Sequence, residues 1–361
     1  MIIVFNVGSS SIKYKLFEIK SDKIIEISKN SVNNIKPSEK EFENSFSTLA
    51  SGFKEYINLI KYAGYRVVYG GNLFDGTEAT GSVIEEIESQ KQLAPLHNPN
   101  AALCIKLSKT VLKEAHHLCF FDTSYFKNMP SLEQNIPIDL EIVKKYKLRR
   151  HGFHGISHQF VYQTIKPHKS EKVVTIHLGA GCSVSAMQHG EPIATSMGLT
   201  PMEGIIMQTR GGNIDPGTVI FLIENIGASK VKEMLNNNSG LAGMTGTNGS
   251  MLNLLYLSGE KIEDNNYLPD KSLSKNDKNY RLAQFALEAY CNSIKKYIGA
   301  YSALLGGIDR IIFTGKIGAG SSVIRKKILS KLDYLKIKNI DIVEPDEERA
   351  IAQKILKIIK K

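Results

Sequence analysis

The sequence predicts an α/β protein made of two similar domains with a cleft between them. Segments of strand character alternate with segments of helical periodicity, which is typical of α/β domains with mixed sheets. A strand followed by a glycine turn near the start of the chain is repeated near its middle. The length of 361 residues also exceeds what one hydrophobic core usually serves. We therefore expect domains at residues 1–150 and 151–346, with a helix at 347–361 that packs back on the first.

The repeated turn is the strongest local signal in the chain. Residues 2–11 and 173–183 each contain an apolar run with one polar residue two positions before a glycine, Asn6 in the first copy and His177 in the second. Small residues let backbone N–H groups approach an anion closely, so two facing turns would hold a polyphosphate. An ordinary β-turn has a similar composition, and the agreement between the copies favours phosphate binding. Neither a G-x-x-x-x-G-K-[ST] loop nor a G-x-G-x-x-G turn occurs.

Local patterns predict the other elements of the first half. Residues 1–20 are expected to form two strands around the first turn, residues 21–60 a polar irregular stretch, and residues 65–69 a strand that ends in a glycine pair. Helical spacing begins after Asn98, a predicted cap, with Pro99 at the first helical position. His97 would then lie at the positive end of a helix, where an anion is favoured. Residues 118–123 form a buried strand ending in Asp122, a position where open α/β sheets place their chemistry.

The second half continues the same alternation. We expect a turn-rich loop at 210–217, a helix at 218–226, loops at 236–269, a long core helix at 280–305, a buried strand at 310–314 and a helix at 347–359. The strand at 310–314 runs into a further glycine-rich turn at 315–320. The last helix begins with acids and ends with lysines, which matches its dipole.

Composition excludes several classes of protein. The net charge of +10 comes from lysines spread along the chain, without the concentrated basic stripe and stacking aromatics of a nucleic-acid-binding protein. The four cysteines show no C-x-x-C spacing, so neither a disulfide framework nor a zinc site is indicated. Apolar runs stay below the roughly 18 residues that span a bilayer, and no basic segment precedes the apolar start. We expect a cytoplasmic protein that binds no membrane.

Eight longer motifs occur in order along nearly the whole chain. They are Asn6–Lys13, Arg66–Gly71, Pro95–Pro99, Phe121–Thr123, His151–Gly155, His177–Gly179, Thr200–Gly204 and Thr209–Pro216. Together they resemble the acetate kinase (acetokinase) family. The resemblance implies two duplicated domains of the ribonuclease H-like fold shared by actin, Hsp70 and sugar kinases. It also implies Mg²⁺-dependent, reversible phosphoryl transfer between ATP and acetate, giving acetyl phosphate and ADP, and a homodimer.

The resemblance assigns roles on the phosphoryl side. Phosphoryl transfer needs positioning and charge neutralisation more than covalent work by the protein. Arg66 and Arg210 match the arginines that face the acetyl carboxylate and the transferring phosphoryl group, and a bidentate guanidinium suits both anions. His154 matches the histidine of the transition state, and Asp122 matches the acid that orients or deprotonates acetate. His97 and His177 match histidines near the phosphoryl oxygens.

Metal and acyl-group contacts follow from the same resemblance. Asn6 and Glu347 match the residues nearest the Mg²⁺, with Mn²⁺ as an alternative ion, and a hard cation is often held by one carboxylate plus substrate oxygens. The small apolar acyl pocket matches Val68, Leu96, Phe153 and Pro201. It implies acetate first and propionate second, and since one methylene is worth only about 1–3 kcal/mol, the choice between them stays open.

Nucleotide contacts are where the chain departs from the family. Expected contacts are Ser9, Ser11 and Lys13 in the first turn, His177, Leu178, Gly179, Ala180 and Gly181 in the second, and Lys316, Ile317, Gly318, Ala319 and Gly320 in the last. Ala180 stands where the family has Asn, Lys316 where it has Gly, and Ala319-Gly320 where it has Glu-Asn. The family's Asp-Phe-Arg adenosine segment is absent around residues 250–252. ATP held through different residues is the favoured explanation, and another donor such as pyrophosphate or a paralogue of low activity are the alternatives. A non-catalytic protein that binds acetyl phosphate is the competing class.

Overall fold

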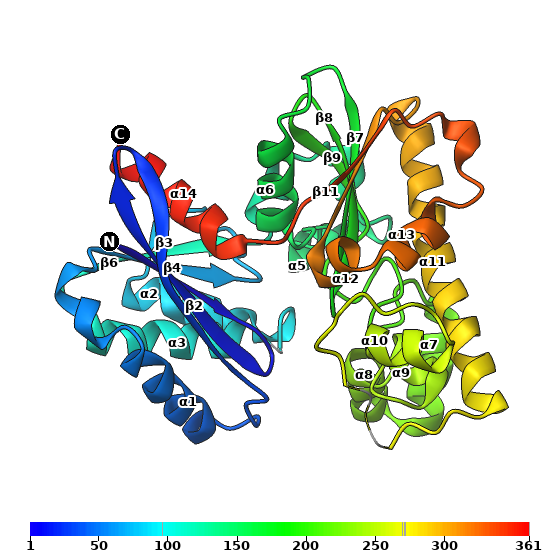
Figure 1. Cartoon of the computed structure of the whole chain (residues 1–361), viewed down its shortest axis with the longest axis horizontal. Coiled ribbons are helices and arrows are strands. Elements are labelled where there is room, and N and C mark those ends of the chain that lie inside the picture. Colours follow the sequence, from blue (N-terminus) through cyan, green and yellow to red (C-terminus); the bar gives the residue numbers. More distant parts are fainter. Residues whose placement is uncertain (96, 269, 271, 361) are drawn as a thin grey trace. The chain divides into compact units, whose positions relative to one another are not determined.

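The computed structural model describes residues 1–95, 97–268, 270 and 272–360. The chain forms two compact units, each of them mixed α/β, which confirms the predicted fold class (Figure 1). Unit 1 consists of Met1–Lys127, Phe153–Phe160 and Asp346–Lys361, and unit 2 consists of Asn128–Gly152 and Val161–Pro345. Among the helices of the described residues, none combines the length and apolar character that crossing a bilayer requires.

Unit 1 is built on a six-stranded sheet in the order β3-β2-β1-β4-β6-β5. The strands are β1 (Ile2–Val7), β2 (Ser11–Lys20), β3 (Lys23–Asn33), β4 (Tyr62–Val67), β5 (Thr77–Glu78) and β6 (His116–Phe121). Strand β1 pairs antiparallel with β2 and parallel with β4, and β4 pairs parallel with β6. The carboxyl ends of β1, β4 and β6 therefore meet at one edge of the sheet.

Helices cover both faces of this sheet. They are α1 (Glu39–Ser51), α2 (Gly81–Ser89), α3 (Asn98–Val111), the start of α6 (Gly155–Ile165) and α14 (Glu347–Ile359), with short 3-10 segments η1 (Lys54–Leu59), η2 (Gln90–Gln92) and η3 (Ser124–Asn128). All six residues of β1 are buried, as a strand covered on both sides requires. Helices α3 and α14 pack on the central strands β1 and β4, and α1 packs on β2 and β3. A Cβ at Gly64 would lie 2.7 Å from Ile351 of α14, so this helix needs a glycine to approach β4 so closely.

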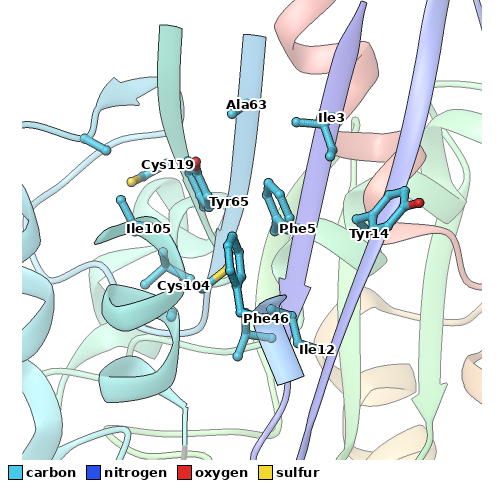
Figure 2. Close-up of a cluster of buried hydrophobic side chains, with 14 of the residues drawn as sticks. Ile3, Phe5, Ile12, Tyr14, Phe46, Ala63, Tyr65, Cys104, Ile105 and Cys119 are labelled. Atoms are coloured by element: carbon cyan, nitrogen blue, oxygen red, sulfur yellow. The ribbon is translucent and has the colours of Figure 1, made fainter. Parts of the chain in front are cut away.

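The core on the α1 and α3 side is aromatic (Figure 2). The ring of Phe5 stacks on Tyr65 with a centroid separation of 5.6 Å, and Phe46 of α1 and Ile105 of α3 belong to the same buried cluster. Such apolar burial is the main source of stability for a sheet of this kind. The Tyr65 hydroxyl contacts His117 Nδ1 at 2.6 Å and Ser108 Oγ at 2.5 Å, which supply its hydrogen-bond partners inside the core.

Unit 2 contains a five-stranded sheet in the order β11-β10-β7-β8-β9. The strands are β7 (Lys172–Leu178), β8 (Cys182–Gln188), β9 (Glu191–Thr195), β10 (Arg310–Thr314) and β11 (Asn339–Ile342). As β1 does in unit 1, β7 turns back into an antiparallel neighbour and pairs parallel with a later strand. In both turns the glycine N–H closes the loop, from Gly8 N to Ser11 O at 2.8 Å and from Gly179 N to Gly181 O at 3.0 Å, and the first loop is one residue longer. The duplication read from the sequence is therefore visible in the backbone.

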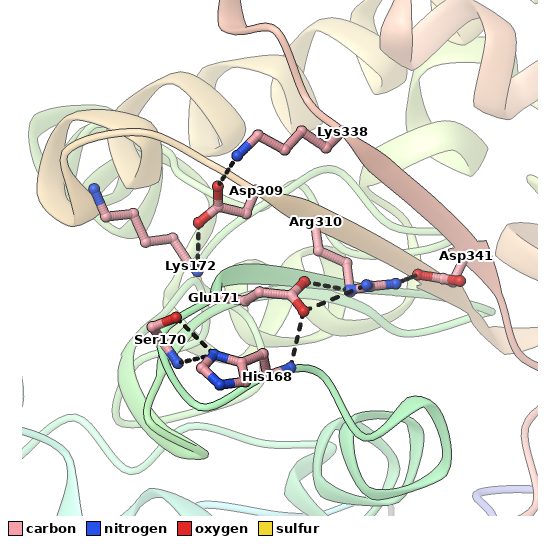
Figure 3. Close-up of polar contacts among 8 residues, drawn as sticks. All are labelled: His168, Ser170, Glu171, Lys172, Asp309, Arg310, Lys338 and Asp341. Atoms are coloured by element: carbon pink, nitrogen blue, oxygen red, sulfur yellow. Dashed lines mark hydrogen bonds and ion pairs between the residues drawn. The ribbon is translucent and has the colours of Figure 1, made fainter.

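Ion pairs hold the amino-terminal edge of the parallel strands of unit 2 (Figure 3). Arg310 of β10 donates from Nε to Glu171 Oε2 at 2.7 Å and also pairs with Asp341 of β11. The Asp309 carboxylate accepts from the backbone N–H of Lys172 at 3.0 Å. Strands β7, β10 and β11 are thus linked at the edge opposite to the glycine turns.

The helices of unit 2 include several that the sequence did not predict, α9 and α10 among them. Among the described residues, the helices of this unit are α4 (Ser131–Gln134), α5 (Leu140–Tyr146), the rest of α6, α7 (Pro216–Ile226), α8 (Ala228–Asn237), α9 (Gly240–Thr245), α10 (Met251–Leu257), α11 (Asp277–Leu305), α12 (Gly315–Gly320), α13 (Ser322–Leu329) and the 3-10 segment η4 (Asp333–Leu335). The expectation of loops at 236–269 is wrong, because α9 and α10 bury Leu241, Leu254 and Leu255 and pack on α11. The irregular stretch expected at 21–60 is also wrong, since it contains β3 and α1.

The boundaries of the two units differ at two places from the predicted domains, residues 1–150 and 151–346. Residues 128–152 belong to unit 2, where His151 N donates to Gly198 O at 2.9 Å and Arg150 pairs with Glu203 at 2.7 Å. Residues 153–160 belong to unit 1, where Gly155 N donates to Asp122 O at 2.9 Å. These contacts join residues far apart in sequence, so local patterns do not reveal them.

Candidate active site

Three predicted site residues meet at the carboxyl edge of the sheet of unit 1. Arg66 at the end of β4 donates to Asp122 through Nη2 to Oδ2 at 2.7 Å and Nε to Oδ1 at 3.2 Å. Its Nη1 donates to Asn6 Oδ1 at 3.2 Å. Asp122 is fully buried, directly after β6. The parallel register of β1, β4 and β6 is what brings these three side chains together.

Burial and crowded acids govern the charges of this cluster. Burial raises the pKa of Asp122, the Arg66 guanidinium opposes that rise, and the charges of Glu347 and Asp75 add to it. Burial works against the charge of Arg66, but the neighbouring carboxylates, Asp122 foremost, hold the pKa of Arg66 above its usual range. Arg66 is therefore a permanent cation among several acids, and Asp122 is a carboxylate that takes up a proton more readily than usual.

The start of α14 supplies two buried acids. Glu347 and Glu348 are 6% and 2% exposed, and Asp346 caps the helix by accepting from Arg349 N at 2.9 Å. Glu348 accepts from Asn6 Nδ2 at 2.5 Å and pairs with Lys13 Nζ at 2.8 Å. Glu348 thus orders two predicted site residues, although it was not itself predicted to belong to the site.

A signal for Glu348 was present in the sequence. Ile351 and Ile355 mark the apolar face of α14, and Glu347 and Glu348 lie four and three residues before Ile351, on the same face. An acid on the buried face of an amphipathic helix requires partners, which for Glu348 are Asn6 and Lys13.

Asn6 and Glu347, the residues predicted to lie nearest a divalent ion, are both buried in unit 1. No group of three or more His, Cys, Asp or Glu side chains stands ready to hold a metal within the described residues. The Asn6 amide is engaged on both sides, because Oδ1 accepts from Arg66 and Nδ2 donates to Glu348. One buried carboxylate and one amide oxygen suit Mg²⁺, which commonly keeps waters and substrate oxygens for the rest of its shell.

The motif at 151–155 reaches Asp122 through its backbone. His154 has a φ of +57°, in the left-handed region, and the next residue, Gly155, donates from N to Asp122 O. A Cβ at Gly155 would lie 2.3 Å from Asp122 O, so only glycine fits. The strained backbone therefore holds His154 one residue from a fixed contact with the Asp122 backbone.

The residues predicted to line the acyl pocket come from both units, and each is described within its own unit. In unit 1, Val68 and Phe153 are 8% and 1% exposed, and the ring of Phe153 lies 6.3 Å from the ring of Tyr69. In unit 2, Pro201 O accepts from Arg210 Nη1 at 2.7 Å. Leu96 lies outside the described residues. His97 precedes α3 as its cap, one residue before the Asn98 that the sequence suggested, and Pro99 occupies the second helical position.

Unit 2 brings the second and last glycine turns together. His177 at the end of β7 pairs in register with Thr314 at the end of β10, and a Cβ at Gly315 would lie 2.3 Å from Leu178 O. Residues 315–320 form the short helix α12 in place of an open turn, with Lys316 exposed and with Gly318 and Ala319 buried. Burial lowers the pKa of Arg210, whose guanidinium lies near Cys182.

The first glycine turn is more open. Ser9 is exposed, Ser11 is half-buried, and the Lys13 side chain is 43% exposed although it pairs with Glu348. The described site residues therefore divide between the two units, with Arg66, Asp122 and Asn6 at the sheet edge of unit 1 and His177 at that of unit 2.

Comparisons of the sequence and of the structure with known proteins agree on one family. The model of the acetokinase family matches residues 1–355. An acetate kinase of Brachyspira hyodysenteriae is 38% identical over 370 residues, which cover 93% of this chain and 88% of that protein. Among solved structures, an acetate kinase of Porphyromonas gingivalis has a TM-score of 0.82 at 27% identity, covering 99% of both chains. A propionate kinase of Francisella tularensis has a TM-score of 0.81 at 30% identity, covering 98% of both.

Proposed function

The chain belongs to the acetokinase family, and from that premise we propose that it is an acetate kinase that transfers a phosphoryl group reversibly between ATP and acetate. An acetate oxygen forms a bond to the γ-phosphorus of ATP while the bond from that phosphorus to the β,γ-bridging oxygen breaks, and the electron pair leaves with ADP. The products are acetyl phosphate and ADP. The observation that carries the proposal is the Arg66–Asp122 pair at the sheet edge, beside Asn6 and the acids of α14.

In the proposed reaction, Arg66 and Asp122 bind and orient acetate. The guanidinium of Arg66 has N–H groups enough to bind a substrate carboxylate besides Asp122 and Asn6. Asp122 keeps Arg66 oriented and orients the acetate. His154 and His97 donate hydrogen bonds to the phosphoryl oxygens, where charge accumulates during transfer.

Arg210 and the turns of unit 2 act on the phosphoryl side. Arg210 neutralises the transferring group, as a guanidinium does in other phosphoryl transferases. His177 and the backbone of Leu178, Gly179, Ala180 and Gly181 bind the nucleotide phosphates, assisted by residues 316–320 of α12 and by Ser9, Ser11 and Lys13 of unit 1. Asn6 and Glu347 would hold Mg²⁺, with Mn²⁺ as a substitute, and a divalent ion supplies charge neutralisation at the phosphate oxygens.

Acetate is the proposed acyl substrate because Val68, Leu96, Phe153 and Pro201 match the residues of the family's small apolar pocket. The similarity to a propionate kinase keeps propionate as the second candidate. The ratio of kcat/KM for the two acids decides between them.

The phosphoryl donor is the second point that needs a direct test. Ala180 and Lys316 replace residues that the family uses on the nucleotide side, so pyrophosphate is the alternative to ATP. The purified chain is assayed for acetyl phosphate with acetate, Mg²⁺ and either ATP, GTP or pyrophosphate. Turnover with ATP supports the proposal. Turnover with pyrophosphate but not with ATP would identify pyrophosphate as the phosphoryl donor. Binding of acetyl phosphate without turnover by any donor would make the chain a non-catalytic binding protein.

We also propose a homodimer formed through α7. Within the 11 described residues of this helix none is buried, and Ile220 and Phe221 are 58% and 62% exposed. Glu224 is its one charged side chain. In a twofold interface the same surface meets itself, so an apolar helix with little charge suits a second copy of this chain better than a charged partner.

The proposed partners are otherwise small molecules. Acetate, acetyl phosphate, ATP and ADP account for the site, without nucleic acid or membrane. An ATP-dependent activity also implies a cytoplasmic location, which cell fractionation with an antibody to the chain tests.

A further inference from the structure

Asn98 is an unusual residue to find in the interior. It is the first residue of α3 and is fully buried, whereas most asparagines lie at the surface. Its Oδ1 accepts from Tyr69 N at 3.2 Å, and its Nδ2 donates to Tyr69 O at 2.9 Å and to Ile87 O at 3.1 Å. The amide therefore binds both backbone groups of one residue and a carbonyl of another. A carboxylate cannot do this because it has no N–H to donate.

These hydrogen bonds hold a segment that has left the sheet. Strand β4 ends at Val67, whose carbonyl accepts from Asp122 N at 3.0 Å, so the backbone of Tyr69 needs partners outside the ladder. Buried backbone groups are costly when unpaired. Asn98 supplies the partners and joins three elements: the end of β4, helix α2 through Ile87, and the start of α3.

The residues next to Tyr69 and Asn98 in the sequence are those proposed to bind the acyl group and the phosphoryl oxygens. Val68 precedes Tyr69, and His97 precedes Asn98. The Tyr69 ring lies 6.3 Å from the ring of Phe153, which is 1% exposed. The Asn98 amide thus fixes the spacing between the segment of Val68 and the segment of His97. Through Tyr69 it also affects the position of the Phe153 ring.

We propose that Asn98 is a positioning residue for acyl recognition, which sets the width of the pocket between Val68, Phe153 and the start of α3. The inference rests on the proposed function, since Val68 and Phe153 matter as a pocket only if the chain binds a short acyl group. Asn98 is buried beneath that surface and acts through Tyr69 without touching the substrate. A loosened segment admits a longer chain at the expense of acetate.

A purely structural role predicts something different. If Asn98 only stabilises the fold, its loss lowers the melting temperature and leaves the preference between acetate and propionate unchanged. The ratio of the two kcat/KM values is thus the decisive measurement, because a loss of folded protein affects both substrates equally.

The test compares Asn98→Ala and Asn98→Ser with wild type and with Ile105→Val. Ile105 is a fully buried residue of the same helix, and its conservative change lowers stability without altering the hydrogen bonds of Asn98. For each protein, kcat and KM are measured with acetate and with propionate, together with the melting temperature. Asn98→Ser retains one hydroxyl that can donate or accept. It also serves as the readout if the alanine variant does not fold.

We expect Asn98→Ala to shift the acetate-to-propionate ratio of kcat/KM towards propionate by about fivefold or more, the change that loss of one net hydrogen bond produces. Asn98→Ser should shift it less, and Ile105→Val should keep the wild-type ratio. A wild-type ratio in both Asn98 variants, with a lowered melting temperature, would overturn the positioning role. If wild type itself turns over no acetate, the proposed function fails, and that result is distinct from an active wild type with unchanged variants.

Discussion

Arg66 and Asp122 form a two-pronged ion pair at the ends of neighbouring parallel strands, with Nη2 and Oδ2 2.7 Å apart and Nε and Oδ1 3.2 Å apart. The pair fixes the plane of the guanidinium before any substrate arrives. A planar, permanently charged group held in this way binds a carboxylate or phosphate with little further loss of freedom. The pair is therefore the most informative feature of unit 1 for the proposed chemistry.

Arg210→Ala should lower kcat with ATP and acetate by about a thousandfold, a loss typical of an arginine that neutralises a transferring phosphoryl group. Steady-state kinetics measure the effect, and Arg281→Ala, on the exposed face of α11, is the control. An Arg210→Ala enzyme within about tenfold of wild type in kcat would place the phosphoryl group elsewhere.

Asp122→Asn should lower turnover by about a hundredfold or more, in the range for loss of a catalytic acid or base, while the protein remains folded. The substitution keeps the shape of the side chain and removes the charge that Arg66 faces. Kinetics and circular dichroism check the two halves of the expectation, with the exposed Asp333→Asn as control. Unchanged kcat and KM would remove Asp122 from the catalytic set.

Gly155→Ala should disturb the site without touching a charged group. The added Cβ meets Asp122 O at 2.3 Å, so the segment carrying His154 has to move. Overpacking costs about 1–3 kcal/mol. An ångström-scale displacement of a reacting group costs on the order of a hundredfold in rate.

Gly299→Ala is the matched control for Gly155→Ala. Gly299 lies inside α11 and no heavy atom within 4 Å would meet its Cβ in the part of the chain that the structure describes. A helix interior favours Ala over Gly by about 0.5–1 kcal/mol, so this variant should be more stable and fully active. Equal activity of the two variants would mean that the Gly155 contact does not position His154.

Acid should destabilise unit 2 through the ion pairs in Figure 3. The hydrogen bond from Arg310 lowers the pKa of Glu171, and the backbone N–H of Lys172 lowers the pKa of Asp309. Because the folded protein holds protons on these groups less tightly than the unfolded chain, their stabilisation is complete above about pH 5 and is lost as the pH falls below about 4. Urea midpoints across this range should decline, and Glu171→Gln should decline less steeply than the control Glu191→Gln, which changes an exposed glutamate of β9. Parallel curves for all three proteins would contradict this.

Phe221→Glu should convert the proposed dimer to a monomer, because it places a charge at the centre of an apolar interface. Analytical ultracentrifugation measures the mass. Leu132→Glu, at an 84% exposed site on α4, is the control and should leave the dimer intact. A Phe221→Glu dimer would exclude α7 as the interface, and a wild-type monomer would exclude the dimer altogether.

Much of the fold could be read from the sequence because its strands are strongly apolar and its turns carry glycine. The pairing of β1 with β2 and of β7 with β8 follows directly from the repeated strand and turn. Helices α9 and α10 were not predicted because their lengths, six and seven residues, are too short to show a helical period. Strand β3 was not predicted because its residues alternate between exposed and half-buried and include few large apolar side chains.

The site was predicted residue by residue, but its supports were not. Arg66, Asp122 and Asn6 were named from motifs, whereas Glu348 and Asn98 act through partners far along the chain. Glu348 meets Asn6 across 342 residues, a separation at which local patterns carry no information. Helical periodicity would still have placed Glu348 on the buried face of α14.

The long path from β1 to α14 also has a consequence for synthesis. The ribosome releases the strands of unit 1 well before the helix that covers Gly64 and carries Glu348. At typical elongation rates of about 5–20 residues per second, that face of the nascent sheet waits on the order of 20 to 70 s for its cover. A bare apolar surface exposed for so long is a natural substrate for a holding chaperone, and the acidic cluster around Arg66 is completed only when α14 emerges.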